Sequence, residues 1–295
     1  MVRHNDVLGS VSSFYAKALN ICRGKGGGLE QAGCCSIDNA TVLLAELAGY
    51  GARDLQGLPE NLATESFGCG NPLSFADVQP GQTVLDLGSG AGLDLVIAAQ
   101  QVGPSGRAIG VDMTPAMIDR ARTNLARAGL TNAEVREGRI EALPVEDESV
   151  DWVISNCVIN LSVHKDQVFS EIVRVLRPGG RMAISDLCVQ DLPRWMFEYD
   201  QLHAACVTGA VPERDYVDRL RRAGLENVQV VGRMVYDIAQ IGAVLEHMLG
   251  DGQGRLLGGA LSSSHLARAL QGRISSVRFA ASKPAAGSTR SATAS

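Results

Sequence analysis

The 295-residue sequence predicts an α/β fold in which helices cover both faces of a doubly wound, parallel sheet. Two observations carry this prediction. Strand-like runs rich in Val, Ile and Leu alternate with helical runs from about Gln79 to Leu187, as in sheets buried on both faces. A glycine-rich turn joins the first strand of this region to its first helix, as in nucleotide-binding folds. The length suits one main domain with a small appendage.

The residues before this region form an irregular segment. A short helix is expected near Ser12–Ile21, followed by a flexible loop at the four glycines of Gly24–Gly28. The apolar spacing of Asp38–Tyr50 predicts a second helix that stops at Gly51. Gly68–Pro72 is expected to form a tight loop.

The central region contains the alternating elements. Strands are expected at Thr83–Leu87, Arg107–Asp112, Ala133–Glu137, Val150–Ser155 and Gly180–Leu187. Helices are expected at Gly92–Val102, Pro115–Ala128 and Lys165–Leu176. A turn is expected at Arg177–Gly180, because Pro and Gly end a helix.

The region after Leu187 is less regular. Helices are expected at Leu192–Cys206, Glu213–Ala223 and Gln240–Leu249, and strands at Glu226–Val235 and Ile274–Ala280 complete the sheet edge. The predicted organisation is an N-terminal cysteine-bearing segment (1–75), a Rossmann-like domain (76–190), a small C-terminal α+β region (191–284) and a disordered Ser/Ala/Thr-rich tail (285–295).

Composition excludes several functional classes. The formal net charge is −5, the pI is near 5.6, and no Lys/Arg-rich run occurs, which argues against a nucleic-acid partner. No signal pattern and no apolar run of ~18–20 residues is present, so a cytoplasmic protein without a membrane partner is expected. Seven cysteines are too few for a disulfide scaffold, which favours a reducing compartment.

A cofactor loop is the most specific feature of the predicted domain. Gly88-x-Gly90-x-Gly92 follows an apolar strand that contains Asp86. Asp112 ends the next strand, 20 residues after Gly92, where a carboxylate can accept hydrogen bonds from a ribose diol. A dinucleotide fingerprint would require glycine at position 93, which is Leu93 here.

This spacing resembles motif I of the class I S-adenosylmethionine (SAM) methyltransferases. Gly138–Pro144 followed by Asp151–Ser155 resembles their adenine-binding loop and fourth strand. The resemblance implies SAM as the cofactor. It implies cofactor-binding roles for ten residues, namely Asp86, Gly88, Ser89, Gly90, Gly92, Asp112, Met113, Ile140, Glu141 and Asn156.

Cysteines occur at positions that suit a ligand site. Cys157 lies just past the fourth strand, at the carboxyl edge where open α/β sheets bind ligands. Cys206 lies at a predicted helix end, Cys69 lies between two glycines, and Cys34 and Cys35 follow the glycine cluster. A free cysteine is most often a small buried hydrophobe, the role expected for the two others, Cys22 and Cys188.

The amino-acid sequence around these cysteines resembles that of the arsenite methyltransferase family over about Val11–Pro284. The segments that carry the resemblance are Ser155–Leu161, Cys206–Ala210, Ser66–Pro72, Cys34–Cys35 and Gly272–Pro284. The resemblance implies that Cys69, Cys157 and Cys206 hold As(III) as thiolates. It also implies that Cys35 or Cys34 is the redox partner of Cys69, with a Cys35–Cys69 bridge preferred. Thioredoxin or glutathione would then reduce this disulfide back to thiols. Soft As(III) prefers sulfur ligands, and its lone pair can attack the methyl group of SAM without a general base.

Two other functions remain open from the sequence. One is methyl transfer from SAM to a quinone or phenol, which needs a base, whereas the carboxyl-edge segment offers Asn156, Asn160 and His164 but no well-placed Asp or Glu. The other is a non-enzymatic thiol protein that sequesters a metalloid, which leaves the glycine loop unexplained. His203, three residues before Cys206, is expected to be a packing or capping residue.

Overall fold

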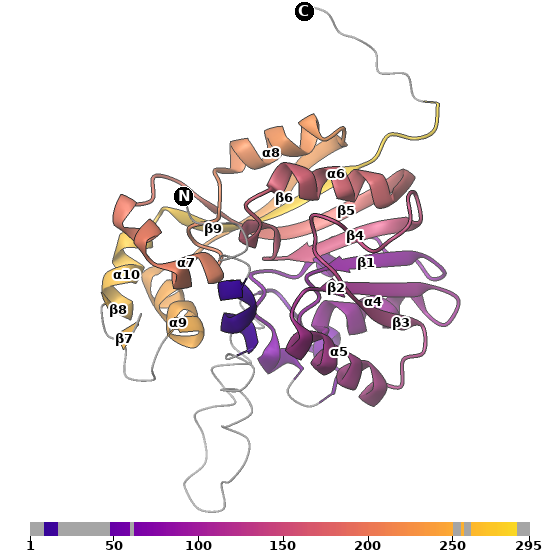
Figure 1. The fold of residues 1–295 in the computed structure, drawn as a ribbon, viewed down its shortest axis with the longest axis horizontal. Helices are drawn as coiled ribbons and strands as arrows, with labels where there is room; N and C mark the ends of the chain where they lie inside the picture. Colours follow the sequence, from indigo (N-terminus) through magenta and orange to yellow (C-terminus); the bar gives the residue numbers. More distant parts are fainter. Residues whose placement is uncertain (1–8, 17–47, 60–61, 250–254, 257–260, 288–295) are drawn as a thin grey trace, which may run out of the picture.

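A seven-stranded mixed sheet forms the centre of the molecule (Figure 1). The computed structural model describes residues 9–16, 48–59, 62–249, 255–256 and 261–287. The strand order is β3-β2-β1-β4-β5-β9-β6. The strands are β1 (Thr83–Leu87), β2 (Arg107–Asp112), β3 (Ala133–Glu137), β4 (Val150–Asn156), β5 (Leu176–Val189), β6 (Glu226–Val235) and β9 (Ile274–Ser282).

The first five strands are parallel, and β9 runs antiparallel to both β5 and β6. This arrangement confirms the predicted doubly wound α/β fold. It also confirms that the two late strands complete the sheet edge, although the sheet as a whole is mixed rather than parallel. Parallel strands need crossover helices, and the alternation along the chain supplies them.

Helices pack on both faces of the sheet. On one face α4 (Leu93–Val102) and α5 (Pro115–Arg127) bury a core with Val84, Trp152 and Ile154. On the other, α6 (Lys165–Val175) and α8 (Glu213–Arg222) bury a core with Leu85 and Leu87. Successive β1 residues thus serve opposite faces, as the period of two in a strand requires.

A third core lies beyond the carboxyl ends of the strands. It combines the N-terminal helix (residues 9–16) with α7 (Asp200–Ala204), α9 (Ile238–Leu249) and α10 (Ser263–Leu270), which gather on one side of the sheet in Figure 1. Short strands β7 (Arg255–Leu256) and β8 (Leu261–Ser262) pair beside α9 and α10. The described part of the predicted Ser12–Ile21 helix is helical, and the predicted helix at Asp38–Tyr50 falls largely outside the described residues.

Two predicted elements differ from the structure. The predicted helix at Leu192–Cys206 is wrong: Tyr199 has an extended backbone (φ −115°, ψ 105°) and separates the 3-10 turn η4 (Arg194–Glu198) from α7. The predicted turn at Arg177–Gly180 lies inside β5, where the pairing with β4 jumps from Val150↔Leu176 to Trp152↔Arg181. The additional residues of β5 between these two pairs form an irregularity of the bulge type, after which β4 and β5 pair in a constant register.

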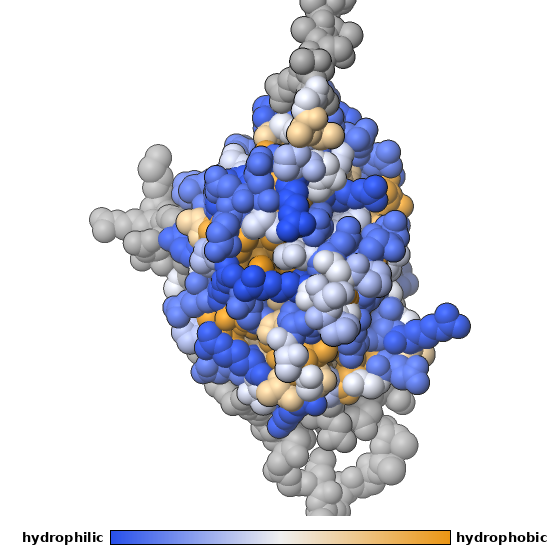
Figure 2. Space-filling view, turned by 90° about the vertical axis from the view of Figure 1, so that its right-hand side faces the viewer, coloured by the Kyte–Doolittle hydropathy of each residue, from blue (hydrophilic) through white to orange (hydrophobic). Residues whose placement is uncertain are grey.

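The right-hand side of the molecule in Figure 1 is mostly hydrophilic, with hydrophobic atoms visible in recesses between polar side chains (Figure 2). Among the described residues, no helix combines the length and the apolar character that a membrane span requires.

Candidate functional site

A cavity lies where the carboxyl ends of β1, β2 and β4 meet the glycine turn. Gly88, Gly90 and Gly92 have φ values of 63°, 53° and 95°, a left-handed conformation that favours glycine. A Cβ on Gly90 would meet only one backbone atom, at 3.9 Å, so at this point the bare backbone faces open space. The turn therefore exposes its peptide groups to whatever fills the cavity.

Buried carboxylates face the same cavity. Asp112 accepts hydrogen bonds from the backbone N–H groups of Gly90 (3.0 Å) and Thr114 (2.8 Å). Burial raises the pKa of Asp112, and burial together with the charges of Asp94 and Asp112 raises the pKa of Asp86 well above its ordinary value. Asp86 Oδ2 and Ser89 Oγ are buried without a hydrogen-bond partner among the residues that the structure describes. Unpaired buried acceptors and donors of this kind suit a polar ligand.

Nine of the ten predicted cofactor residues line this cavity. They are Asp86, Gly88, Ser89, Gly90, Asp112, Met113, Ile140, Glu141 and Asn156. Gly92 does not line it: Gly92 caps the N-terminus of α4, and its missing Cβ lets the chain approach Ala121 of α5, which an added Cβ would meet at 3.3 Å. Gly92 thus fixes the packing of the two helices rather than the cavity wall.

The loop that carries Cys69 packs against the ends of β4 and β5. A Cβ on Gly68 would lie 2.2 Å from Asn156 Nδ2, and one on Gly70 would lie 2.5 Å from the Cβ of Ser185. Only glycine permits approaches this close. The predicted tight loop is therefore pressed onto the sheet edge next to Cys157.

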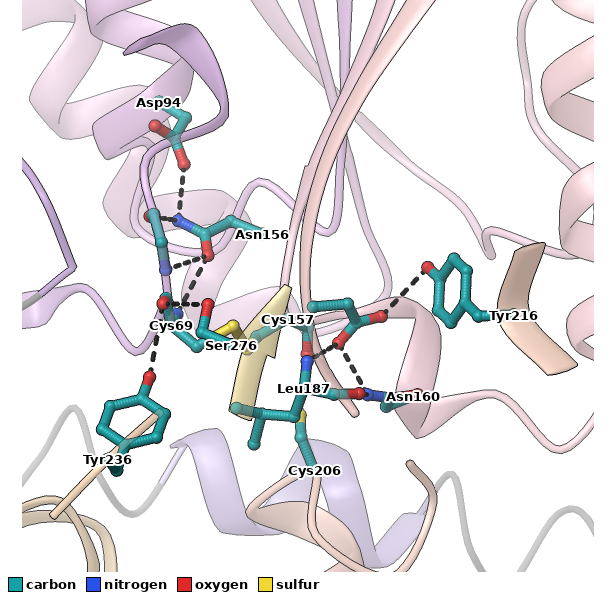
Figure 3. Close-up of a disulfide and its surroundings, with 12 residues drawn as sticks. Cys69, Asp94, Asn156, Cys157, Asn160, Leu187, Cys206, Tyr216, Tyr236 and Ser276 are labelled. Carbon is teal, nitrogen blue, oxygen red and sulfur yellow. Dashed lines mark hydrogen bonds between the residues drawn. A yellow bond between two sulfur atoms is a disulfide. The ribbon is translucent and has the colours of Figure 1, made fainter. Parts of the chain in front are cut away.

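Three of the five predicted site cysteines come together at this edge (Figure 3). Cys69 and Cys157 form a disulfide with their Cα atoms 5.9 Å apart. Cys206 is a free, buried thiol that donates a hydrogen bond of 2.7 Å to the carbonyl of Cys157. Cys34 and Cys35 lie outside the described residues. The sequence favoured a Cys35–Cys69 bridge, whereas the structure bonds Cys69 to Cys157, because the Cys69 loop is held against the residue next to Cys157.

Cys157 and Cys206 both have left-handed backbones, each with φ of 60°. For a residue other than glycine this conformation costs about 1–3 kcal/mol, and it concentrates at functional sites. Both residues are at least 95 % buried. Burial raises the pKa of the Cys206 thiol far above its ordinary value, so the free thiol keeps its proton in the absence of a ligand.

A second, mostly apolar cavity extends from the three cysteines towards α9 and α10. Its wall includes Leu187, Val207, Tyr236, Ile241, Leu245, Leu270 and Ile274. The two cavities share four residues: Ser66, Phe67, Gly68 and Cys157. The glycine-turn cavity and the thiol cavity therefore meet at Cys157.

A buried carboxylate, Asp186, lies behind the thiols and was not predicted. One carboxylate oxygen of Asp186 and the sulfur atoms of Cys69 and Cys157 all lie within 4.8 Å of one another. The segment after β4 contains no Asp or Glu, as noted from the sequence, but β5 brings Asp186 to this edge from elsewhere in the chain.

Three groups around the thiol site donate hydrogen bonds to Asp186. It accepts hydrogen bonds from Asn160 Nδ2 (2.7 Å), Leu187 N (3.0 Å) and the Tyr216 hydroxyl (3.2 Å). Burial raises the pKa of Asp186 to about 7, although the buried ammonium of Lys165 opposes this rise. The pKa of Lys165 itself falls to about 8, with burial as the main cause. His203 Nε2 bonds the Leu161 carbonyl at 3.1 Å, which agrees with the predicted packing or capping role.

The N-terminal segment is fastened over the first cavity by two contacts that the sequence did not reveal. Glu65 and Arg120 of α5 form a buried bidentate ion pair, and Glu65 lines the cavity. Tyr15 also lines it and donates a hydrogen bond of 3.2 Å to the carbonyl of Ala204, two residues before Cys206. Contacts over such sequence separations leave no local pattern for a sequence reader to detect.

Known proteins are similar to this chain in sequence and in fold. A family model described as a methyltransferase domain matches residues 79–237. An arsenite methyltransferase of Halobacterium salinarum is 50% identical over 201 residues, which cover 67% of this chain and 50% of that protein. An arsenite methyltransferase of Aquipseudomonas alcaligenes is 33% identical over 250 residues, which cover 82% of this chain and 68% of that protein.

A solved structure gives the same relationship in three dimensions. The crystal structure of an arsenic(III) S-adenosylmethionine methyltransferase from Chlamydomonas reinhardtii superposes with a TM-score of 0.58 at 32% identity, covering 84% of this chain and 74% of that one. The chain thus spans about half the length of the Halobacterium relative and about two thirds to three quarters of the other two.

Proposed function

Because this chain belongs to the arsenite methyltransferase family, we propose that it transfers the methyl group of SAM to trivalent arsenic held by cysteine thiolates. The product is a methylated arsenical, and the biological role is arsenic detoxification. The observation that carries this proposal is that the glycine-turn cavity and the three-cysteine cavity meet at Cys157.

The first cavity fits SAM. The peptide groups at Gly88 and Gly90 would face the cofactor, the carboxylate of Asp112 suits a ribose diol, and the unpaired Asp86 Oδ2 suits a cationic or hydrogen-bond-donating group. Ile140 supplies an apolar wall and Glu141 a carboxylate, which Ser162 Oγ holds at 2.6 Å. When bound there, SAM supplies an electrophilic methyl group.

The three cysteines suit As(III) as substrate. A soft, thiophilic ion prefers thiolates to carboxylates or imidazoles, and the apolar wall of the second cavity excludes water from the site. Binding of arsenite replaces the thiol protons by As–S bonds and releases the hydroxyl groups of arsenite as water. The lone pair on arsenic is the nucleophile, so the main task of the protein is orientation, which contributes up to ~7–11 kcal/mol in favourable cases.

The thiols also provide the electrons that the reaction needs. Methyl transfer formally oxidises As(III) to As(V), and the return to As(III) takes two electrons. Two thiolates supply these electrons when they join as a disulfide, and the Cys69–Cys157 bond is one pairing that the fold accommodates. A dithiol of the thioredoxin type, or glutathione, then reduces the disulfide by thiol exchange. This requirement for reduced thiols favours a cytoplasmic location.

The quinone or phenol alternative receives less support. Asp186 is the carboxylate beside the thiols, but it lines neither cavity, and three protein groups already donate to its oxygens. A general base needs a free acceptor within reach of the substrate proton.

The test is arsenic speciation of the products with SAM, arsenite and a thiol reductant. Methylated arsenicals should form with the wild type, and Cys157→Ser and Cys206→Ser should each abolish them. Cys188→Ser is the matched control, because Cys188 is buried on β5 in a core with α8 and belongs to neither cavity. Full activity in both site variants would contradict the thiolate mechanism. Methylation of a phenolic acceptor that survives both substitutions would favour the alternative.

A further inference from the structure

The sulfur of Cys69 sits on a loop with no regular structure of its own. The loop lies between the short 3-10 turns η1 (Ala63–Glu65) and η2 (Pro72–Ser74). The carboxamide of Asn156, at the end of β4, holds its backbone: Oδ1 accepts hydrogen bonds from Cys69 N (3.0 Å) and Gly70 N (3.1 Å), and Nδ2 donates to Gly70 O. One side chain thus satisfies three backbone groups of the loop.

Two further groups fix the orientation of this carboxamide. Asn156 Nδ2 also lies within hydrogen-bond distance of Asp94 Oδ2 (3.1 Å) and of the Tyr50 hydroxyl (2.9 Å), so its two N–H groups are shared among three acceptors. The Tyr50 hydroxyl in turn donates to Asp94 Oδ1 (2.8 Å). A flipped amide would place its oxygen against the Asp94 carboxylate and the Gly70 carbonyl. Asp94 lies in the first turn of α4, directly after the glycine turn, so the cofactor side of the molecule orients the group that holds the thiol loop.

The loop is held from its other side by β6 and β9. Ser276 Oγ of β9 donates to the Cys69 carbonyl at 2.7 Å, and the Tyr236 hydroxyl, just past β6, donates to the same carbonyl at 3.4 Å (Figure 3). Asn156 thus binds the N–H group of Cys69, and these two hydroxyls bind its carbonyl. The Cys69 sulfur is left facing Cys157, the neighbour of Asn156 in sequence.

We propose that Asn156 is the positioning residue of the thiol site: its carboxamide, oriented by Asp94 and Tyr50, holds the Cys69 loop where the Cys69 and Cys157 sulfurs meet. The sequence resemblance implied a cofactor-binding role for Asn156. Its polar atoms instead bond the loop, α4 and Tyr50. The consequence for arsenic binding rests on the proposed function, but the consequence for pairing of the two thiols does not.

The experiment measures that pairing without arsenic or SAM. Full-length protein is equilibrated in buffers of reduced and oxidised glutathione, and the Cys69–Cys157 disulfide is quantified by peptide mapping with mass spectrometry. In this exchange two protein thiols lose two electrons and two protons, and one oxidised glutathione becomes two reduced ones. Asn156→Ala should lower the equilibrium constant for pairing about tenfold, equivalent to about 30 mV for a two-electron couple.

Two further variants separate positioning from a general loss of stability. Asn132→Ala removes an amide that donates to the carbonyls of Ala99 and Gly103, away from both cavities, and should leave pairing unchanged. Asn156→Asp keeps the acceptor for the two loop N–H groups but sets its second oxygen against Asp94. Adding Asp94→Asn restores a donor there, so the double variant should regain part of the pairing even if Asn156→Ala fails to fold.

A folded Asn156→Ala variant that pairs Cys69 with Cys157 as readily as the wild type would overturn the proposal. So would a double variant that pairs no better than Asn156→Asp alone. Methylation assays on the same proteins should show a higher KM for arsenite in Asn156→Ala. A wild type that pairs its thiols normally yet methylates no arsenical would refute the proposed function and leave the positioning role standing.

Discussion

Cys157 and Cys206 occupy backbone positions that would ordinarily suit glycine. Both have φ of 60°, and the two residues are joined by the hydrogen bond from the Cys206 thiol to the backbone carbonyl of Cys157. A β-carbon in this conformation costs about 1–2 kcal/mol. Cysteine at these positions therefore supplies a sulfur at the expense of stability, as expected for residues kept for chemistry.

The left-handed backbone can be tested by comparing two substitutions at one position. Cys206→Gly should be about 1 kcal/mol more stable than Cys206→Ala, because glycine adopts φ of 60° without strain. Urea unfolding of both variants measures the difference. Cys188, a buried cysteine inside β5, is the control and should give the opposite order, with alanine the more stable. An alanine variant at 206 as stable as the glycine variant would refute the strain.

The buried carboxyl of Asp186 predicts a pH dependence of stability. Burial raises its pKa in the folded protein to about 7, whereas an unfolded aspartate titrates near ~3.9. Between these values the folded state binds the proton more strongly, so this group's contribution to the free energy of unfolding falls as pH rises from about 4 to 7. Because one pKa unit equals about 1.4 kcal/mol, the fall amounts to a few kcal/mol at most.

Asp186→Asn should remove this contribution. The free energy of unfolding of the variant, measured in urea at pH 5 and pH 7.5, should decline less with pH than that of the wild type. Asp215→Asn on the exposed side of α8 controls for the loss of one negative charge. Parallel pH profiles for the wild type and Asp186→Asn would show that the carboxyl does not titrate in this range.

Single residues were predictable where a local motif marks them and unpredictable where the partner is distant. Gly88, Gly90 and Asp112 stand at fixed spacing around one turn, and all three line the first cavity. Glu65 and Asp186 carry no such mark. Glu65 pairs with Arg120, 55 residues away, and Asp186 lies within 4.8 Å of the sulfurs of Cys69 and Cys157, both distant in the sequence.

At the scale of elements, the Glu65–Arg120 ion pair fastens η1 to α5. The side chains are 3% and 10% exposed, so removal of one partner leaves a buried group unpaired. Glu65→Gln and Arg120→Met should each cost about 3 kcal/mol, within the range for a broken buried pair. The double variant should cost less than the sum, and urea unfolding of all four proteins measures the coupling.

The exposed bidentate pair between Glu213 and Arg233 is the matched control, because it has the same geometry near the surface. Glu213→Gln should have a far smaller effect than Glu65→Gln, since solvent screens an exposed pair. Additive costs for Glu65→Gln and Arg120→Met would contradict a coupled ion pair. Loss of the pair should also weaken SAM binding in calorimetry, because Glu65 lines the first cavity, where SAM is proposed to bind.

Elements followed the sequence most closely where the hydrophobic period was strong. The strands β1, β2, β3 and β6 begin and end at the predicted residues. The predicted Leu192–Cys206 helix failed because no Gly or Pro marks the break at Tyr199. The helix α10, which packs on α9, was not predicted at all.

At the scale of the whole molecule, the Cys69–Cys157 bond joins the N-terminal segment to the sheet across 88 residues. In the chain-entropy model, closing a loop of this size stabilises the folded state by about 4–5 kcal/mol. Reduction should therefore lower the free energy of unfolding by about that amount. Cys69→Ser should unfold at the same urea concentration with or without reductant, which separates this bond from any involving other cysteines. Equal stability of oxidised and reduced wild type would contradict the prediction.

The same bond predicts how turnover stops. Without an external dithiol, the amount of methylated arsenical should stay close to the amount of enzyme, because the proposed cycle consumes a pair of protein thiols each time. Added thioredoxin with its reducing system should restore continuous turnover. Product in large excess over enzyme without any reductant would rule out protein thiols as the electron source.

The position of β9 has a consequence for how the chain acquires its shape during synthesis. β9 inserts between β5 and β6, and its Ser276 bonds Cys69, 207 residues earlier in the chain. The ribosome releases the cofactor half long before β9, and domains fold from the N-terminus as they emerge. The nascent protein can therefore form its glycine turn early, whereas the hydrogen bond from Ser276 to the Cys69 carbonyl can form only after β9 has been made. The Cys69 loop thus gains its last support when translation has run through to β9.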